Sequence, residues 1–186
     1  MNKAVMISIQ PKWCELIASG KKTIEVRKSE PKLDIPFQVY IYQTKKKWIY
    51  RLLKKLGLYK GKVIGEFVCD KVNNILYDDI DGNNMPLEKL LKKSCLQYKE
   101  LCEYGNSKDL YKDLYAWHIS QLKIYDKPKK LSEFKRLIKC KDWYNGMSGC
   151  EDVCGCYENG CCINGIRKDI QTRPPQSWCY VEELEE

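Results

Sequence analysis

MISIQPKWCELIASGKKTIEVR, residues 6–27, is the stretch of sequence that decides the fold. It predicts four consecutive elements: a strand over 4–9, a helix over 11–20, a turn, and a second strand over 23–27. Pro11 suits the first helical position, because its missing N–H would have no partner inside the helix there. Gly20 is suited to the left-handed conformation that ends many helices. One face of the predicted helix is apolar, formed by Trp13, Leu16 and Ile17.

Three charged residues, Lys22, Glu25 and Arg27, follow this helix within six positions. Side chains alternate along a strand, so Glu25 and Arg27 share one face. Lys22 has the opposite parity and joins them only if the turn or a bulge rotates it. Corners between a helix and a strand often carry ligand contacts, which favours a binding site. A solvated network of salt bridges is the alternative.

The spacing of Gly20, Lys22 and Arg27 closely resembles the signature of the ASCH domain family. Two later segments are similar to that family as well, namely YAWHISQLKIYDKPKKLSEF at 115–134 and RPPQSWCYVE at 173–182. The resemblance spans most of the chain outside 140–170 and is closest to small ASCH proteins of bacteria and their phages. It implies membership of the PUA-like group, small β-barrels that are mostly linked to RNA.

Periodicity alone indicates an α+β fold, and the resemblance sharpens this to a PUA-like β-barrel, closed or nearly closed, with flanking helices. The barrel is expected over residues 1–139 plus 171–186, with a Cys-rich insert over 140–170 before the last strand. The remaining elements are expected as strands over 37–43, 62–72, 115–125 and 177–182, and helices over 48–56 and 87–104. The apolar phase of 115–125 shifts between Ile119 and Leu122, which predicts a β-bulge.

The resemblance implies that Lys22, Glu25 and Arg27 line a cleft between the barrel and the helix over 11–20. Arg27 could bind a phosphate through two hydrogen bonds. Lys22 could hold a phosphate or a base carbonyl, and Glu25 could orient Lys22 or accept from an exocyclic amine. Trp13 is a candidate stacking platform for a base, with a role in the core as the alternative. We therefore expect nucleic-acid binding, of RNA or of a modified nucleotide by preference.

Two other functions stay open. Some ASCH proteins are amidohydrolases of N4-acetylcytidine and others are ribonucleases, which makes Lys22 and Glu25 candidate catalytic residues. In the amidohydrolase pattern the lysine acts with a nearby threonine and a glutamate, whereas here Glu25 occupies the position of that threonine and Thr23 lies on the other side of Ile24. The third possibility is an accessory protein of a prophage or other mobile element that binds another protein.

The whole chain has 33 Lys and Arg against 25 Asp and Glu, a formal charge of +8, which favours an anionic partner. Residues 45–62, here called the basic segment, hold eight Lys or Arg and no carboxylate, and predict an amphipathic helix over 48–56. Such a segment suits a nucleic-acid backbone, with a merely solvated helix face as the alternative. Its candidate contacts are Lys45, Lys46, Lys47, Arg51, Lys54 and Lys55.

Six of the eleven cysteines fall within 23 residues: Cys140, Cys150, Cys154, Cys156, Cys161 and Cys162. Four thiolates on short glycine-containing loops favour a structural Zn²⁺ ion, with four of these six as ligands. Disulfides, free thiols or an iron–sulfur cluster are the alternatives. No histidine or carboxylate is spaced to complete an open catalytic metal site.

The length of 186 residues predicts one domain with an appendage. No apolar run approaches the ~20 residues that cross a bilayer, and the N-terminus does not resemble a secretory signal. We therefore expect a cytoplasmic protein without membrane contact. His118, the sole histidine, is expected to be packed or on the surface rather than a base. Three polar residues of the recognised segments could contact a ligand or serve caps and turns: Ser120, Gln176 and Ser177.

Overall fold

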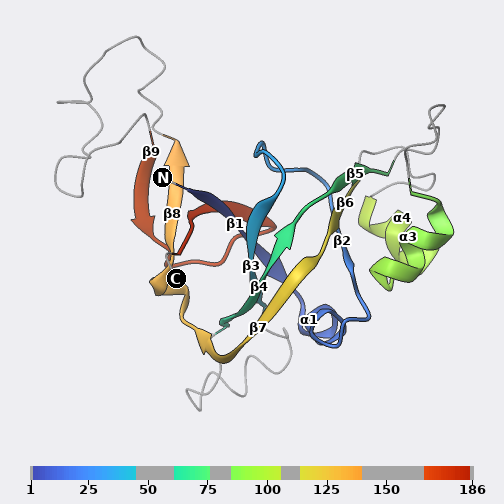
Figure 1. Cartoon of the computed structure of the whole chain (residues 1–186), viewed down its shortest axis with the longest axis horizontal. Coiled ribbons are helices and arrows are strands. Elements are labelled where there is room, and N and C mark those ends of the chain that lie inside the picture. The colour runs from blue at the N-terminus through green and yellow to red at the C-terminus, as the bar shows by residue number, and fades with distance from the viewer. Residues whose placement is uncertain (1, 45–60, 76–84, 106–113, 140–165, 185–186) are drawn as a thin grey trace, which may run out of the picture.

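The computed structural model of the chain describes residues 2–44, 61–75, 85–105, 114–139 and 166–184. Its elements alternate between strands and short helices (Figure 1). In chain order they are β1 (Lys3–Ile9), α1 (Pro11–Ala18), β2 (Ile24–Arg27), β3 (Phe37–Gln43), β4 (Val63–Cys69), β5 (Val72–Asn74), α3 (Leu87–Ser94), α4 (Tyr98–Gly105), β6 (Tyr115–His118), β7 (Ser120–Lys129), a short 3₁₀ turn (Leu131–Glu133), β8 (Lys135–Lys139), β9 (Ile166–Ile170) and β10 (Trp178–Glu182).

The strands form two sheets. A seven-stranded mixed sheet has the order β7-β4-β3-β1-β10-β8-β9, and an antiparallel three-stranded sheet has the order β2-β6-β5. The α+β class is confirmed. We expected a barrel that is closed or nearly closed; within the part of the chain that the structure describes, the two edges of the large sheet do not pair with each other, so no closed barrel is present there.

β1 is the central strand of the large sheet, parallel to β3 and antiparallel to β10. Residues 4–9 are all buried, so its alternating side chains supply two cores, one on each face. Val5 and Ile7 enter one core together with Trp117, and Met6 enters the other together with Phe134. A strand covered on both faces must be apolar at nearly every position, which explains the MISI run of the opening sequence.

The expected long strand over 115–125 is two strands in different sheets. The break falls at Ile119, whose N–H donates to Thr23 of the small sheet, while Ser120 begins β7 in the large sheet. The predicted bulge is confirmed just beyond it. The pairing of β7 with β4 shifts register between Ser120 and Lys123, and Gln121 adopts a positive φ of 46°.

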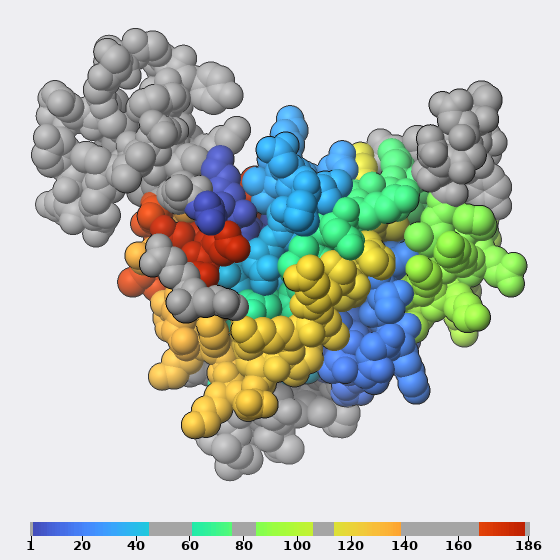
Figure 2. All heavy atoms as spheres, viewed as in Figure 1, coloured from blue at the N-terminus to red at the C-terminus, as the bar shows by residue number. Residues whose placement is uncertain are grey.

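The helices α3 and α4 pack against the small sheet. Ile24, Val26 and Ala116 of the sheet share a buried cluster with Leu90 of α3 and Leu101 of α4. Figure 1 shows this helix pair on the outer side of β2, at the opposite end of the molecule from β8 and β9. In Figure 2 the same pair forms a lobe that adjoins atoms of the N-terminal part of the chain. The expected helical region over 87–104 is thus confirmed as two helices.

The decisive stretch folds nearly as expected. α1 begins at Pro11 and ends at Ala18, and Gly20 has a φ of +72°, the left-handed conformation that favours glycine. The chain then turns through hydrogen bonds from Gly20 N–H to Ile17 and from Lys22 N–H to Leu16, and enters β2. These bonds fix where the charged residues of β2 lie relative to α1.

Three further regions differ from expectation. The strand expected over 62–72 is two strands, β4 and β5. Residues 135–139 form β8, which the sequence did not indicate, and 166–170 form its partner β9 within the segment that we assigned to the insert. Residues 45–60 and 140–165 lie outside the described residues. No helix in the described part of the chain is long and apolar enough to cross a bilayer.

Candidate functional site

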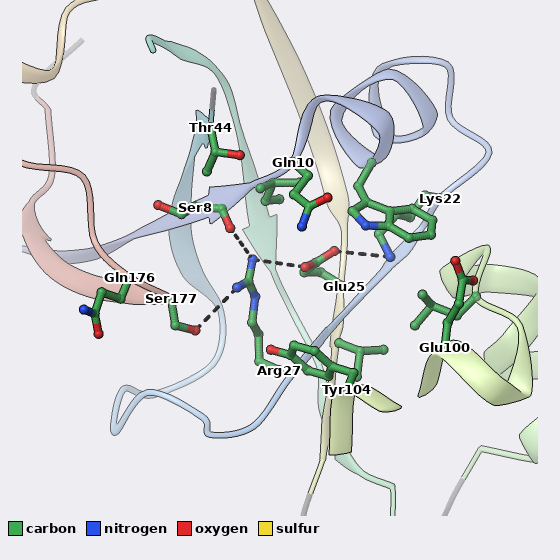
Figure 3. A pocket seen from close by; sticks show the side chains of 14 residues that line it. Ser8, Gln10, Lys22, Glu25, Arg27, Thr44, Glu100, Tyr104, Gln176 and Ser177 are labelled. Atoms are coloured by element: carbon green, nitrogen blue, oxygen red, sulfur yellow. Dashed lines mark hydrogen bonds and ion pairs between the residues drawn. The ribbon is translucent and has the colours of Figure 1, made fainter. Parts of the chain in front are cut away.

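A cavity of about 430 Å³ lies between the end of β1, α1, β2 and α4 (Figure 3). Pockets of roughly 300–1,000 Å³ are the usual size for small-molecule ligands. The three charged residues singled out in the sequence all line it, together with Trp13. The complete lining is Ser8, Ile9, Gln10, Trp13, Lys22, Glu25, Val26, Arg27, Thr44, Leu96, Glu100, Tyr104, Gln176 and Ser177.

Glu25 lies between the two cations. Its Oε1 is 3.0 Å from Arg27 Nη2, and its Oε2 is 3.2 Å from Lys22 Nζ. The three side chains are 9%, 8% and 2% exposed for Glu25, Arg27 and Lys22, respectively. Glu25 Oε2 is enclosed and has no hydrogen bond in the described structure, so its contact with Lys22 is an ion pair without hydrogen-bond geometry.

Arg27 is anchored on the large sheet. Its Nη2 donates to the carbonyl oxygen of Ser8 at 2.8 Å, and its Nη1 approaches Ser177 Oγ at 3.4 Å. The hydroxyl of Tyr104 also contacts Arg27. The long contact to Ser177 is weak for a hydrogen bond. Of the two hydrogen bonds from the terminal nitrogens, the one from Nη1 is the weaker, so Nη1 gives up less when it binds a ligand; Nε is buried and has no hydrogen-bond partner in the described structure.

Lys22 is held by two acceptors. Besides the ion pair with Glu25, its Nζ donates to the carbonyl oxygen of Ser94 at 2.8 Å. Ser94 is the last residue of α3, where backbone carbonyls lack helical partners. The turn after Gly20 therefore does rotate Lys22 toward Glu25. Lys22 also ties the end of α3 to the cavity.

Two cations and one carboxylate leave the cluster of Lys22, Glu25 and Arg27 with one net positive charge. In the described part of the chain, neither cation has a second carboxylate within ion-pair distance. A charge removed from water is costly unless a counter-charge is near. The side of the cavity formed by these three residues is thus suited to an anionic group, whereas Glu100 on the opposite side brings the charge of the lining as a whole to zero.

Trp13 is half-buried in the cavity wall, whereas Trp117 is fully buried in the core. Lys12 Nζ lies 4.2 Å and Lys22 Nζ 5.1 Å from the centre of the Trp13 ring, both within the range of cation–π attraction. Trp13 therefore lines the cavity and also packs against the core, so both roles that the sequence suggested for it stay open.

The opposite wall comes from α4, and sequence reasoning missed it. Glu100 and Tyr104 line the cavity although they lie about 80 residues from Lys22 in the chain. Glu100 Oε2 accepts the backbone N–H of Gln97 at 2.9 Å, which is the main reason that its pKa is lowered, and Oε1 faces Lys12 at 3.3 Å. Burial raises the pKa of the Tyr104 hydroxyl.

The other polar candidates divide into two groups. Gln176 and Ser177 line the cavity, as do Ser8 and Thr44, which the sequence did not single out. Ser120 instead donates to the carbonyl oxygen of Val68 and supports the sheet.

His118 is a surface residue, as expected. Its Nδ1 lies 2.6 Å from Asp70 Oδ1, and both side chains are more than one-third exposed. The hydrogen bond from His118 lowers the pKa of Asp70. The pair is not among the residues that line the cavity.

The two remaining groups of candidates lie outside the described residues. They are the six clustered cysteines and the lysines and arginine of the basic segment. Within the part of the chain that the structure describes, no three His, Cys, Asp or Glu side chains are grouped so that they could hold a metal ion. The basic segment starts beside the cavity, because Thr44 lines it and the N–H of Gln43 donates to Lys62.

Comparison with known proteins gives one family match. The model of the family described as ASCH domain matches residues 7–129. A search of curated proteins gave no match. Among solved structures, the crystal structure of ASCH from Zymomonas mobilis has 19% identity and a TM-score of 0.49, covering 69% of this chain and 73% of that chain. A mutant of the same protein has 18% identity and a TM-score of 0.47, covering 69% and 74%.

Proposed function

The chain belongs to the ASCH domain family, and from this and from the cavity we propose that it binds nucleic acid, RNA by preference, by holding one nucleotide beside α1. The observation that carries the proposal is the net positive charge of Lys22, Glu25 and Arg27 in the wall of a cavity of about 430 Å³. A nucleotide supplies the negative charge that would balance these residues, because each phosphate carries one.

The residues have separate roles in this proposal. Arg27 Nη1, with its weak contact to Ser177, binds a phosphate oxygen. Trp13 stacks against the base, since single-stranded RNA is recognised largely by stacking on aromatic rings. Lys22 and Glu25 hold Arg27 and the end of α3 in place, because their own polar atoms are largely occupied.

We propose that the basic segment contacts the neighbouring phosphates. Thr44, the residue directly before this segment, lines the cavity, and the carbonyl oxygen of Lys62, its last residue, accepts the N–H of Gln43. A strand that leaves the cavity past Thr44 would meet the first lysines of that segment, Lys45, Lys46 and Lys47. Contacts of this kind add affinity without sequence preference.

A hydrolase that uses Lys22 is the second candidate, for a cleft-lining lysine next to a carboxylate could serve as nucleophile or base. Two observations rank the hydrolase below nucleic-acid binding. The Lys22 nitrogen already donates to the Ser94 carbonyl and faces Glu25, so protein groups occupy it. Glu25 also stands where the amidohydrolase pattern has a threonine.

We also propose that the six clustered cysteines bind a structural Zn²⁺ ion through four thiolates. Support comes from the sequence alone, through their number and the glycines between them. The ion would fold the segment between β8 and β9 and would take no part in binding within the cavity.

The test is fluorescence polarisation with short labelled RNAs from 50 to 200 mM NaCl. We expect binding at low salt, and a log–log slope that becomes shallower by about 0.7 for each phosphate that a variant no longer neutralises. Lys46→Gln/Lys47→Gln should reduce the slope, whereas Lys3→Gln/Lys32→Gln, which removes the same charge from a distant exposed surface, should not. Arg27→Gln should weaken binding at every salt concentration. An RNA that fails to bind at 50 mM NaCl would overturn the proposal.

A further inference from the structure

We propose that Glu100 on α4 determines which base the cavity accepts, and that it selects guanine through two parallel hydrogen bonds to one carboxylate. This rests on the proposed function, because it assigns a base to the nucleotide held there. Glu100 is a specificity-determining residue in this scheme. The phosphate is bound elsewhere, by Arg27.

The first argument concerns which carboxylate a ligand can reach. The cavity has two, Glu25 and Glu100. Glu25 is closed off, because both its oxygens face cations and Oε2 is inaccessible to solvent. The side chain of Glu100 is 36% exposed, so of the two it is the acceptor that a bound base can contact.

The second argument concerns what a base would displace. The Glu100 side chain has one ionic partner in the described structure, Lys12, at 3.3 Å. Lys12 is 63% exposed, and exposed ion pairs of this kind contribute little. A base that moved Lys12 aside would therefore sacrifice little binding energy by doing so. It would also uncover the ring of Trp13, over which Lys12 lies.

The third argument concerns rigidity. Glu100 Oε2 accepts the N–H of Gln97 at 2.9 Å, which fixes the carboxylate in the first turn of α4. A carboxylate has about four acceptor positions. One hydrogen bond to Gln97 therefore leaves each oxygen able to accept another. Leu96, Trp13 and Tyr104 line the same cavity and offer apolar surface to a planar ring.

The fourth argument concerns the bases themselves. Guanine presents two adjacent donors on its pairing edge, N1–H and the N2 amino group, which match the two oxygens of a carboxylate. Adenine and cytosine place a ring-nitrogen acceptor beside their amino group, and uracil places carbonyl oxygens beside N3–H. Each of these three would set one acceptor against a carboxylate oxygen, so guanine is the base that fits.

The experiment compares four labelled pentamers, UUGUU, UUAUU, UUCUU and UUUUU, by polarisation at 50 mM NaCl. We expect UUGUU to bind at least about fivefold more tightly than the others, the lower end of what one bidentate pair contributes. Glu100→Gln keeps the hydrogen bond from Gln97 but offers one acceptor and one donor. UUGUU should therefore lose its advantage and bind this variant no more tightly than the other three pentamers, whose affinities should not fall.

Lys12→Met is the matched control, because it removes the competing cation and leaves the carboxylate. It should retain or increase the preference for guanine. The inference is wrong if the wild-type protein binds all four pentamers equally, or if Glu100→Gln keeps the guanine preference. Failure of all four to bind would instead remove the proposed function and this inference with it. Melting temperatures check that each variant is folded.

Discussion

Replacing Glu25 with glutamine should destabilise the protein strongly, because it leaves two enclosed cations without their counter-charge. The side chains concerned are nearly buried, at 9%, 8% and 2% exposure for Glu25, Arg27 and Lys22. Glutamine has nearly the same shape, so the change removes a charge and little packing. The net charge of the cluster rises from +1 to +2.

The magnitude follows from the two ion pairs. At 3.0 and 3.2 Å, each contributes a gross attraction of about 5 kcal/mol at an effective dielectric constant near 20. Part of this offsets the cost of removing the Glu25 carboxylate from water. Removing one partner of a buried ion pair costs roughly 3–5 kcal/mol. For a chain of this size that lowers the melting temperature by roughly 6–20 °C.

Urea denaturation followed by far-UV circular dichroism measures the effect directly. Glu100→Gln is the matched control, because it makes the same chemical change at a carboxylate that is 36% exposed and whose one ionic partner among the described residues is an exposed lysine. Its cost should stay below about 1 kcal/mol. If Glu25→Gln and Glu100→Gln unfold at the same urea concentration as the wild type, the buried ionic cluster does not exist as described.

Three other predictions address separate features. The Asp70 pKa is lowered by His118, so the unfolded chain binds more protons than the folded one in acid, and stability falls as pH drops through the folded pKa. Asp70→Asn should therefore lose less stability than the wild type between pH 5 and pH 3, as urea midpoints will show. Protein purified without chelator should contain about one Zn²⁺ per chain by mass spectrometry, and a zinc-free preparation that stays folded in strong chelator would refute the metal site. Incubation with N4-acetylcytidine should release no acetate, and a rate that Lys22→Ala abolishes would favour the hydrolase instead.

The local parts of the fold could be predicted from the sequence. The strand, helix, turn and strand of residues 4–27 depend on Pro11, Gly20 and nearby alternation, all of which act within a few residues. The bulge near Gln121 was visible for the same reason, since the apolar phase of the strand changes there.

Whether the sheet closes into a barrel could not be predicted from such local patterns. Whether the strand of residues 115–125 continues in one sheet or changes sheet depends on Ile119 pairing with Thr23, a contact nearly 100 residues away in the chain. β8 and β9 were missed because their sequences, KRLIK and IRKDI, are mostly charged. Strands at the edge of a sheet need few apolar side chains, so hydrophobic periodicity gives almost no indication of them.

Part of the cavity lining could be predicted from the sequence. Lys22, Glu25 and Arg27 were found through their spacing beside a helix end, and the structure places all three in one cavity wall. Glu100 and Tyr104 were missed because α4 reaches the cavity by packing its apolar face on the small sheet. Their only local signal was a carboxylate and an aromatic residue four positions apart on one helix face, a pattern that many surface helices share.

The most direct test of the central claim is a titration of ¹⁵N-labelled protein with UUGUU at low salt, followed by NMR. Nucleotide binding in the cavity predicts saturable shifts of the Trp13 indole N–H and of the backbone amides of Thr44 and Glu100, which line it from three sides. The amides of β8, at the far end of the large sheet, should not move. Saturable binding that shifts β8 or other distant strands and leaves Trp13, Thr44 and Glu100 unchanged would contradict the account.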